Sequence, residues 1–196
     1  TGSLSLNNPA DRVNWDPTLT IEKSPLWPYT GKSHAIWRCP ADRSTAGPAG
    51  GPRGPRTRSR SMSLWVGGID GGKGGWGPGG DWKVFRKTTE MTVLPPTDVW
   101  VLLDEREDSI NDGWFWVSEA GYLPVADPTQ YRIVDWPANY HINSTSFSFA
   151  DGHAEMHRWT DPRTIPLVGI GVGIALNVAM PGNLDVQWSP LRVLKP

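Results

Sequence analysis

Residues 144–159 place the strongest local constraint on the fold, because two runs of alternating polar and apolar residues flank Asp151-Gly152. The Asp-Gly dipeptide tolerates the two positive φ angles of a type I′ turn, so the pattern predicts a β-hairpin with a two-residue loop. In that register Phe149 faces Ala154 and Phe147 faces Met156. We therefore expect these four side chains to form one buried, apolar face of the hairpin.

The same register predicts a second, polar face that carries Ser146, Ser148, His153, Glu155 and His157. A His-x-Glu-x-His strip of this kind is a candidate for metal binding or for general acid–base chemistry. An antiparallel sheet that is open to water on one side also needs a polar outer face. The spacing matches no established metal motif, so the solvent-facing interpretation is favoured.

Glycine, proline and tryptophan dominate the composition: the 196 residues include 22 Gly, 19 Pro and 12 Trp. The Gly and Pro content favours a loop-rich chain with few long helices, while the tryptophans argue against disorder. We expect an α+β, mostly β fold: a small antiparallel sheet with hairpins, long loops and few short helices. Without an internal repeat or a clear linker, residues 1–196 are expected to form one domain, with 1–23 as an entry loop and 165–196 as a C-terminal extension.

The net charge, the single cysteine and the apolar segments limit the kinds of partner and the location that we expect for this chain. The formal net charge of −1 indicates neither a nucleic-acid partner nor a membrane surface. The single cysteine, Cys39, excludes an internal disulfide. The most apolar segment, 167–180, is too short to span a hydrocarbon core of about 30 Å, and we expect a buried strand or loop there. The sequence starts at Thr1 without a recognisable signal peptide, which is typical of an excised ectodomain.

Several other segments carry local signals. Residues 81–93 favour a short amphipathic helix closed by Pro95-Pro96, and residues 67–80 a glycine-rich loop that lacks the features of a phosphate cradle. A central strand is expected at 99–103, and we expect it to form a second hairpin with a strand at 114–117. Further strand-like runs lie at 35–40, 61–66 and 185–188.

The connection between 103 and 114 is acidic, with five carboxylates within nine residues. Such carboxylates repel one another unless a cation lies among them. Three interpretations follow. Ion pairs with the arginines of the 53–60 loop would neutralise the charge; calcium would suit Asp108, Asn111 and Asp112 as oxygen ligands, although the EF-hand spacing is absent; or two carboxyls could act in catalysis.

The catalytic interpretation would be glycoside hydrolysis, which uses a pair of carboxyl groups as acid and nucleophile or base. Tryptophan rings would then supply platforms for the sugar. The candidate carboxyls are Asp104, Glu105 or Glu107, with Glu155. The candidate platforms and tuning histidines are Trp114, Trp116 and Trp136 with His141, His153 and His157.

Taken in order, these segments resemble a large bacterial group of type II secretion pseudopilin-like, prepilin-type proteins that carry an H-X9-DG motif. His141, nine further residues and Asp151-Gly152 reproduce the motif. The resemblance covers most of residues 24–164. The other matching blocks are Trp37-Arg38-Cys39-Pro40-Ala41-Asp42, Arg60-Ser61-Met62-Ser63, Trp65-Val66-Gly67-Gly68, Asp104-Glu105 with Ser109-Ile110-Asn111-Asp112-Gly113, and Phe149-Ala150-Asp151-Gly152-His153.

The resemblance implies a periplasmic or extracellular domain that follows an N-terminal hydrophobic helix, which is missing from this sequence. It implies a non-enzymatic assembly or binding module with pseudopilin-like or secretion-system partners, without nucleic acid or membrane contact and without a required cofactor. Some pseudopilins hold calcium in a C-terminal loop, but their ligands have no residue-by-residue match here. The alternative is a glycoside hydrolase or carbohydrate-binding protein on the same scaffold, because function resides in the site and not in the fold.

Overall fold

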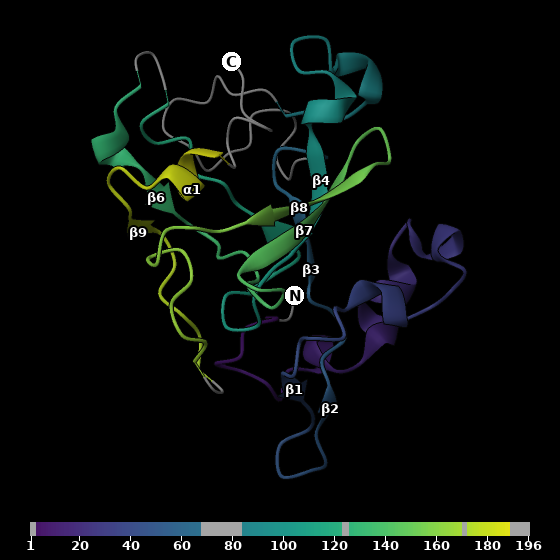
Figure 1. Cartoon of the computed structure of the whole chain (residues 1–196). Coiled ribbons are helices and arrows are strands. Elements are labelled where there is room, and N and C mark those ends of the chain that lie inside the picture. Colours follow the sequence, from purple (N-terminus) through teal and green to yellow (C-terminus); the bar gives the residue numbers. More distant parts are fainter. Residues whose placement is uncertain (1–2, 68–83, 123–125, 170–171, 189–196) are drawn as a thin grey trace.

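A five-stranded sheet forms the centre of the molecule (Figure 1). The computed structural model describes residues 3–67, 84–122, 126–169 and 172–188. The strand order is β5-β3-β4-β7-β8, and every neighbouring pair is antiparallel except β3 and β5, which are parallel. The strands are β3 (Arg60–Ser63), β4 (Trp100–Asp104), β5 (Trp114–Phe115), β7 (Ser144–Phe149) and β8 (Ala154–Arg158).

The remaining elements are short, which confirms the prediction of a mostly β, α+β fold. Two-stranded ribbons are formed by β1 (Thr45–Ala46) with β2 (Gly54–Pro55), and by β6 (Arg132–Ile133) with β9 (Val178–Ala179). The α-helix α1 (Leu184–Trp188) lies near β6 and β9 (Figure 1). Single-turn 3-10 helices occupy Arg12–Asn14, Pro17–Leu19, Ile21–Lys23, Trp27–Thr30, Ala35–Trp37, Thr88–Glu90, Pro96–Asp98 and Pro128–Gln130. No helix among the described residues combines the length and apolar character needed to cross a membrane.

The core lies on one face of the five-stranded sheet and is built from aromatic side chains. Phe147 and Phe149 are 2% and 3% exposed, so their predicted burial is confirmed. The ring of Trp100 meets Phe147 edge to face at 5.6 Å. A register shift between Trp100 and Leu102 inserts one extra residue into β4, which lets Trp100 and Leu103 face the same core. The predicted central strand at 99–103 is thus confirmed as β4.

The β7–β8 hairpin differs from the predicted one in its turn. The Gly152 N–H donates to the Phe149 carbonyl at 3.0 Å, and the Phe149 N–H donates to the His153 carbonyl at 2.9 Å. Three residues, 150–152, therefore form the loop, with Gly152 at φ +93°. This is a turn followed by a left-handed glycine, the second common solution for a tight hairpin. The predicted two-residue loop was wrong.

The extra loop residue shifts the register by one and turns the side chains of β8 to the opposite faces. Phe147 pairs with Glu155, and Ser146 pairs with Met156. Met156, expected in the core, is 55% exposed. His157, expected on the polar face, instead stacks on Trp188 at 3.7 Å. The predicted division of β8 into an apolar and a polar face was wrong for this reason.

Three other predicted elements were also wrong. The run at 35–40 holds a 3-10 turn, Ala35–Trp37, closed by the Trp37 N–H, which donates to the His34 carbonyl at 3.2 Å. Residues 185–188 are helical, since the Asn183 side chain accepts the backbone N–H groups of Asp185 and Val186 and so caps α1. Finally, β5 does not form a hairpin with β4, because β3 lies between them.

The segments 81–93 and 167–180 also differ from the predicted structure, as far as the described residues show. The described part of 81–93 holds only the 3-10 turn Thr88–Glu90; residues 81–83, like most of the glycine-rich loop at 67–80, lie outside the described residues. The described part of the apolar segment 167–180 is mostly loop: Leu167 is 97% exposed, Val178–Ala179 forms β9, and Met180 is buried in a second apolar cluster with Tyr131 and Ile133. Its apolar composition therefore does not reflect a place in the main core.

Candidate functional site

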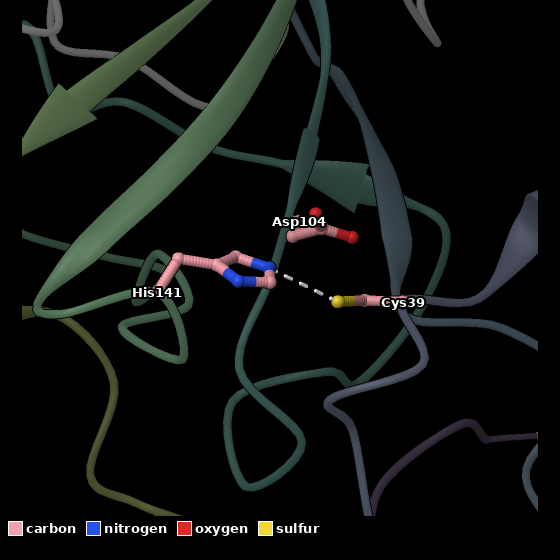
Figure 2. A group of neighbouring side chains, drawn as sticks. All are labelled: Cys39, Asp104 and His141. Carbon is pink, nitrogen blue, oxygen red and sulfur yellow. Dashed lines mark hydrogen bonds between the residues drawn. The ribbon is translucent and has the colours of Figure 1, made fainter.

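Three side chains of different chemistry meet beside the end of β4. Cys39, Asp104 and His141 each offer one metal-binding atom, and these atoms all lie within 4.8 Å of one another. The Cys39 Sγ lies 3.3 Å from the His141 Nε2 (Figure 2). Cys39 and Asp104 are buried, at 2% and 1% exposed, while His141 is exposed. The cluster thus has a buried floor and an open side.

The protein scaffold holds the two buried members of this cluster in place. The Cys39 N–H donates to the Ser59 Oγ at 2.7 Å, and that hydroxyl in turn lies 3.3 Å from the Asp104 Oδ1. The Asp104 Oδ2 accepts from the Ser146 hydroxyl at 2.9 Å and pairs with the Arg60 guanidinium at 3.2 Å. Ser59, Arg60 of β3 and Ser146 of β7 therefore orient the carboxylate.

Sequence reasoning found two of the three members. Asp104 was a candidate catalytic carboxyl and His141 a motif residue, but they were not expected to meet, and Cys39 was named only for its disulfide chemistry and as part of a block of the family resemblance. The signal available in the sequence was the block Trp37–Asp42, which resembles the same family as His141. The spacing of these residues in the sequence does not predict that they meet, because 102 positions separate Cys39 from His141.

Within the acidic connection, two of the five carboxylates, Asp104 and Asp108, pair with arginine. Arg106 and Asp108 form a buried two-pronged pair, with Nε–Oδ1 at 2.7 Å and Nη2–Oδ2 at 2.8 Å. The Arg106 guanidinium also donates to the carbonyls of Pro166 and Leu167. Arg60 pairs with Asp104. Ion pairing is thus present, but its strongest cation comes from the connection itself and not from the 53–60 loop.

The candidate calcium ligands have other partners in this structure. Both Asp108 oxygens accept from Arg106, and Oδ2 also accepts the Gly169 N–H at 3.0 Å. The Asp112 Oδ1 accepts the Trp114 N–H at 2.7 Å. A carboxylate already balanced by a buried guanidinium has little remaining attraction for a cation. Calcium at Asp108, Asn111 and Asp112 stays a prediction, with no support from these contacts.

The four candidate glycosidase carboxyls lie in different surroundings. Asp104 belongs to the Cys39 cluster, and Glu105, which follows it on the chain, is fully buried and accepts the Ser109 hydroxyl at 2.7 Å. Glu107 accepts the Tyr140 hydroxyl, and Glu155 lies on β8 opposite Phe147. No contact in the described part of the chain joins two of these four side chains. Burial raises the pKa of Glu105 well above its usual value, and the nearby Asp135 raises it further.

A tryptophan-lined hollow of about 290 Å³ lies instead beside β5. Trp114 and Trp116, two of the predicted platforms, line it together with Asp112 and Asp135. Asp135 is buried and accepts the Trp116 N–H at 2.5 Å, and burial raises its pKa to about 7. Sequence reasoning missed Asp135, although a carboxylate between Val134 and Trp136 in an apolar run is an unusual pattern.

The third predicted platform and the remaining histidines lie elsewhere. Trp136 is buried, with its Nε1–H donating to the Ala175 carbonyl at 2.9 Å, so its ring faces are covered. His153 binds Asp151 at 2.6 Å and stacks on Phe149, next to the turn that contains Gly152. His157 stacks on Trp188. The structure therefore does not gather His141, His153 and His157 into one site.

Comparison with protein-family models, with curated proteins and with solved structures found no match for this chain.

Proposed function

We propose that this chain is an exported, pseudopilin-like domain that serves as an assembly or binding module of a type II secretion-type system. The observation that carries the proposal is the convergence of the segments on which the family resemblance rests. Cys39 of the first block contacts His141 of the motif, and Arg60 of the second block pairs with Asp104 of the fourth. Segments far apart in the chain thus meet at one end of the sheet.

The rest of the motif supports the same role. Asp151-Gly152 forms the turn after β7, while His141 lies just before β7 begins at Ser144. Between them, Ser146 reaches the Asp104 carboxylate. The motif therefore brackets one strand and anchors it to β4. The motif residues thus have a structural role in holding β7 in the sheet. Such a role is expected in a module that has no enzymatic activity.

The partner surface that we propose is the N-terminal arm of 3-10 helices, drawn in purple and blue in Figure 1. It exposes three large apolar side chains within eleven residues: Leu26 at 42%, Tyr29 at 86% and Ile36 at 51%. Exposed apolar side chains grouped in this way are typical of interaction sites. The proposed occupant is another pseudopilin-like protein of the same system.

This proposal is tested by measuring association between the purified chain and the pseudopilin-like proteins encoded in the same genome, using sedimentation velocity. Tyr29→Ser and Ile36→Ser should weaken the association about 10-fold or more, because truncated central anchors cost at least about 1.4 kcal/mol. Leu167→Ser, at a side chain that is 97% exposed elsewhere, is the matched control. Absence of association with every such protein, or equal binding by all variants, would contradict the proposal.

A second candidate function, carbohydrate binding, is favoured by the hollow beside β5. Trp114 and Trp116 can stack on sugar rings, and Asp112 and Asp135 can accept hydrogen bonds from sugar hydroxyls. Isothermal titration with a panel of oligosaccharides tests this function, with Trp114→Ala expected to abolish binding and Trp27→Ala as control. Chromogenic glycosides, compared between the wild type and Asp135→Asn, separate binding from hydrolysis. No heat and no turnover with any sugar would remove this candidate.

A further inference from the structure

We propose that Cys39, Asp104 and His141 form a binding site for a zinc ion, independently of the secretion or carbohydrate function. The three residues come from separate parts of the chain: a loop after the 3-10 turn Ala35–Trp37, the end of β4, and the loop before β7. Their metal-binding atoms converge on one point within 4.8 Å. Thiolate, imidazole and carboxylate are the three ligand types that zinc uses in proteins.

The arrangement of the three groups favours a metal over a nucleophilic triad. In a triad the base lies in the middle, with its near ring nitrogen toward the nucleophile and its far nitrogen toward the acid. Here the ring edge of His141 that carries Nε2 is turned toward both Cys39 and Asp104 (Figure 2). All three donor atoms therefore point into a common space, as ligands of one ion do.

The distances suit a tetrahedral zinc centre. Zinc bonds of 2.0–2.3 Å place neighbouring ligand atoms about 3.3–3.8 Å apart. The observed separation of 3.3 Å between the Cys39 Sγ and the His141 Nε2 lies at the lower edge of this range. The other separations among the three ligand atoms are at most 4.8 Å, and His141 is the exposed member of the cluster.

Asp104 retains the capacity for one further bond. An ionised carboxylate has about four lone-pair sites. The contacts with Ser59, Ser146 and Arg60 use three of them. These same contacts would orient the carboxylate as supporting hydrogen bonds commonly orient metal ligands. The thiolate supplies one negative charge to a bound Zn²⁺, while the Asp104 carboxylate shares its charge between the ion and the Arg60 guanidinium.

The ligand set also selects the metal. A thiolate and an imidazole favour zinc over calcium, which takes six or more oxygen ligands. Three protein ligands leave a fourth position for water on the exposed side, beside His141. Binding requires the Cys39 thiol to lose its proton, so the apparent zinc affinity is expected to rise with pH.

The test uses the purified, chelator-treated chain with its cysteine kept reduced. Zinc affinity is measured by competition with a chromophoric chelator, and cobalt(II) serves as a spectroscopic probe because thiolate ligation gives a charge-transfer band in the near ultraviolet. We expect one zinc per chain and a thiolate-to-cobalt band. Stoichiometric zinc binding with no thiolate band, or no binding while the thiol is free to react with an alkylating reagent, would overturn the proposal.

Matched variants assign the ligands. Cys39→Ser should abolish the cobalt band, and His141→Ala and Asp104→Asn should each weaken zinc binding about 10-fold or more. His34→Ala, at another exposed histidine, should bind zinc as the wild type does. Because His141 is exposed, its variant is expected to fold, and circular dichroism checks this. Equal affinity in His141→Ala and His34→Ala would refute the site.

Discussion

Phe147 lies directly opposite Glu155 in the β7–β8 ladder, one position away from the partner that an Asp-Gly two-residue turn would give it. The cause is local: the Phe149 carbonyl accepts the Gly152 N–H, so three residues form the loop. The consequence is not local, because each side chain of β8 changes face. Met156 is exposed, and His157 reaches the aromatic group around Trp159 and Trp188.

The turn predicts a specific requirement for glycine at position 152. Its φ of +93° lies in the region that favours glycine, while a Cβ there would meet nothing within 4 Å. Gly152→Ala should therefore lower the free energy of unfolding by about 1 kcal/mol through backbone strain alone. Gly54→Ala is the control, since Gly54 has equal space and no positive φ. Urea denaturation of both variants measures the difference, and equal stabilities would rule out strain.

The sequence predicted those parts of the fold that depend on local patterning. The hairpin at 144–159, the burial of Phe147 and Phe149 and the central strand β4 followed from alternation and β-branched residues. The register did not, because Asp-Gly fits two turn types that differ by one residue. The strand order also did not, since the parallel pairing of β5 with β3 is a tertiary choice. The helix at 184–188 depends on the cap by Asn183, which strand-like alternation concealed.

The candidate site was predictable only in pieces. Asp104, Trp114 and Trp116 were identified from the acidic connection and its flanking tryptophans. Their division between two places, the Cys39 cluster and the hollow beside β5, depends on which face of β4 or β5 each residue occupies. Asp135 and Cys39 belong to these sites because they contact residues that are distant in the chain, Trp116 and His141. Such contacts have no signal in the local pattern of one sequence.

Two arginine–aspartate pairs, each formed by residues two positions apart in the sequence, differ in burial. They should therefore differ in their contribution to the free energy of unfolding. Arg106 and Asp108 are buried, whereas the Arg163 side chain, paired with Asp161, is 46% exposed. Arg106→Met should cost about 3–5 kcal/mol, because it leaves a buried carboxylate unpaired. Arg163→Met should cost much less, because the exposed pair is screened by solvent. Chemical denaturation compares them, and similar losses would mean that burial does not determine the energy of these pairs.

The carboxylate of Asp185 connects α1 to the chain after β8. It accepts the backbone N–H groups of Thr160 and Asp161 and the Thr160 hydroxyl, at 2.8–3.0 Å for the shortest contact of each. Asp185→Ala should therefore lower the free energy of unfolding by about 2–3 kcal/mol, because three partly buried donors lose their acceptor. Asp127→Ala, which removes an exposed cap of Thr129, should cost less. Thermal denaturation of both variants measures the two losses. A larger loss for Asp127→Ala than for Asp185→Ala would contradict this role of Asp185.

The buried carboxyl of Asp135 predicts a pH dependence of stability. Burial raises its pKa to about 7, so the folded chain holds a proton that the unfolded chain loses above about pH 4. The wild type should accordingly lose stability as the pH rises from about 4 to about 7. Asp135→Asn cannot titrate and keeps the acceptor for the Trp116 N–H. Between pH 5 and pH 8, the free energy of unfolding of Asp135→Asn should increase relative to that of the wild type by at least about 1 kcal/mol, as measured by urea denaturation. Asp127→Asn, the control, should show no such trend. If the difference for Asp135→Asn does not change with pH, the Asp135 carboxyl is already ionised in the folded chain at pH 5.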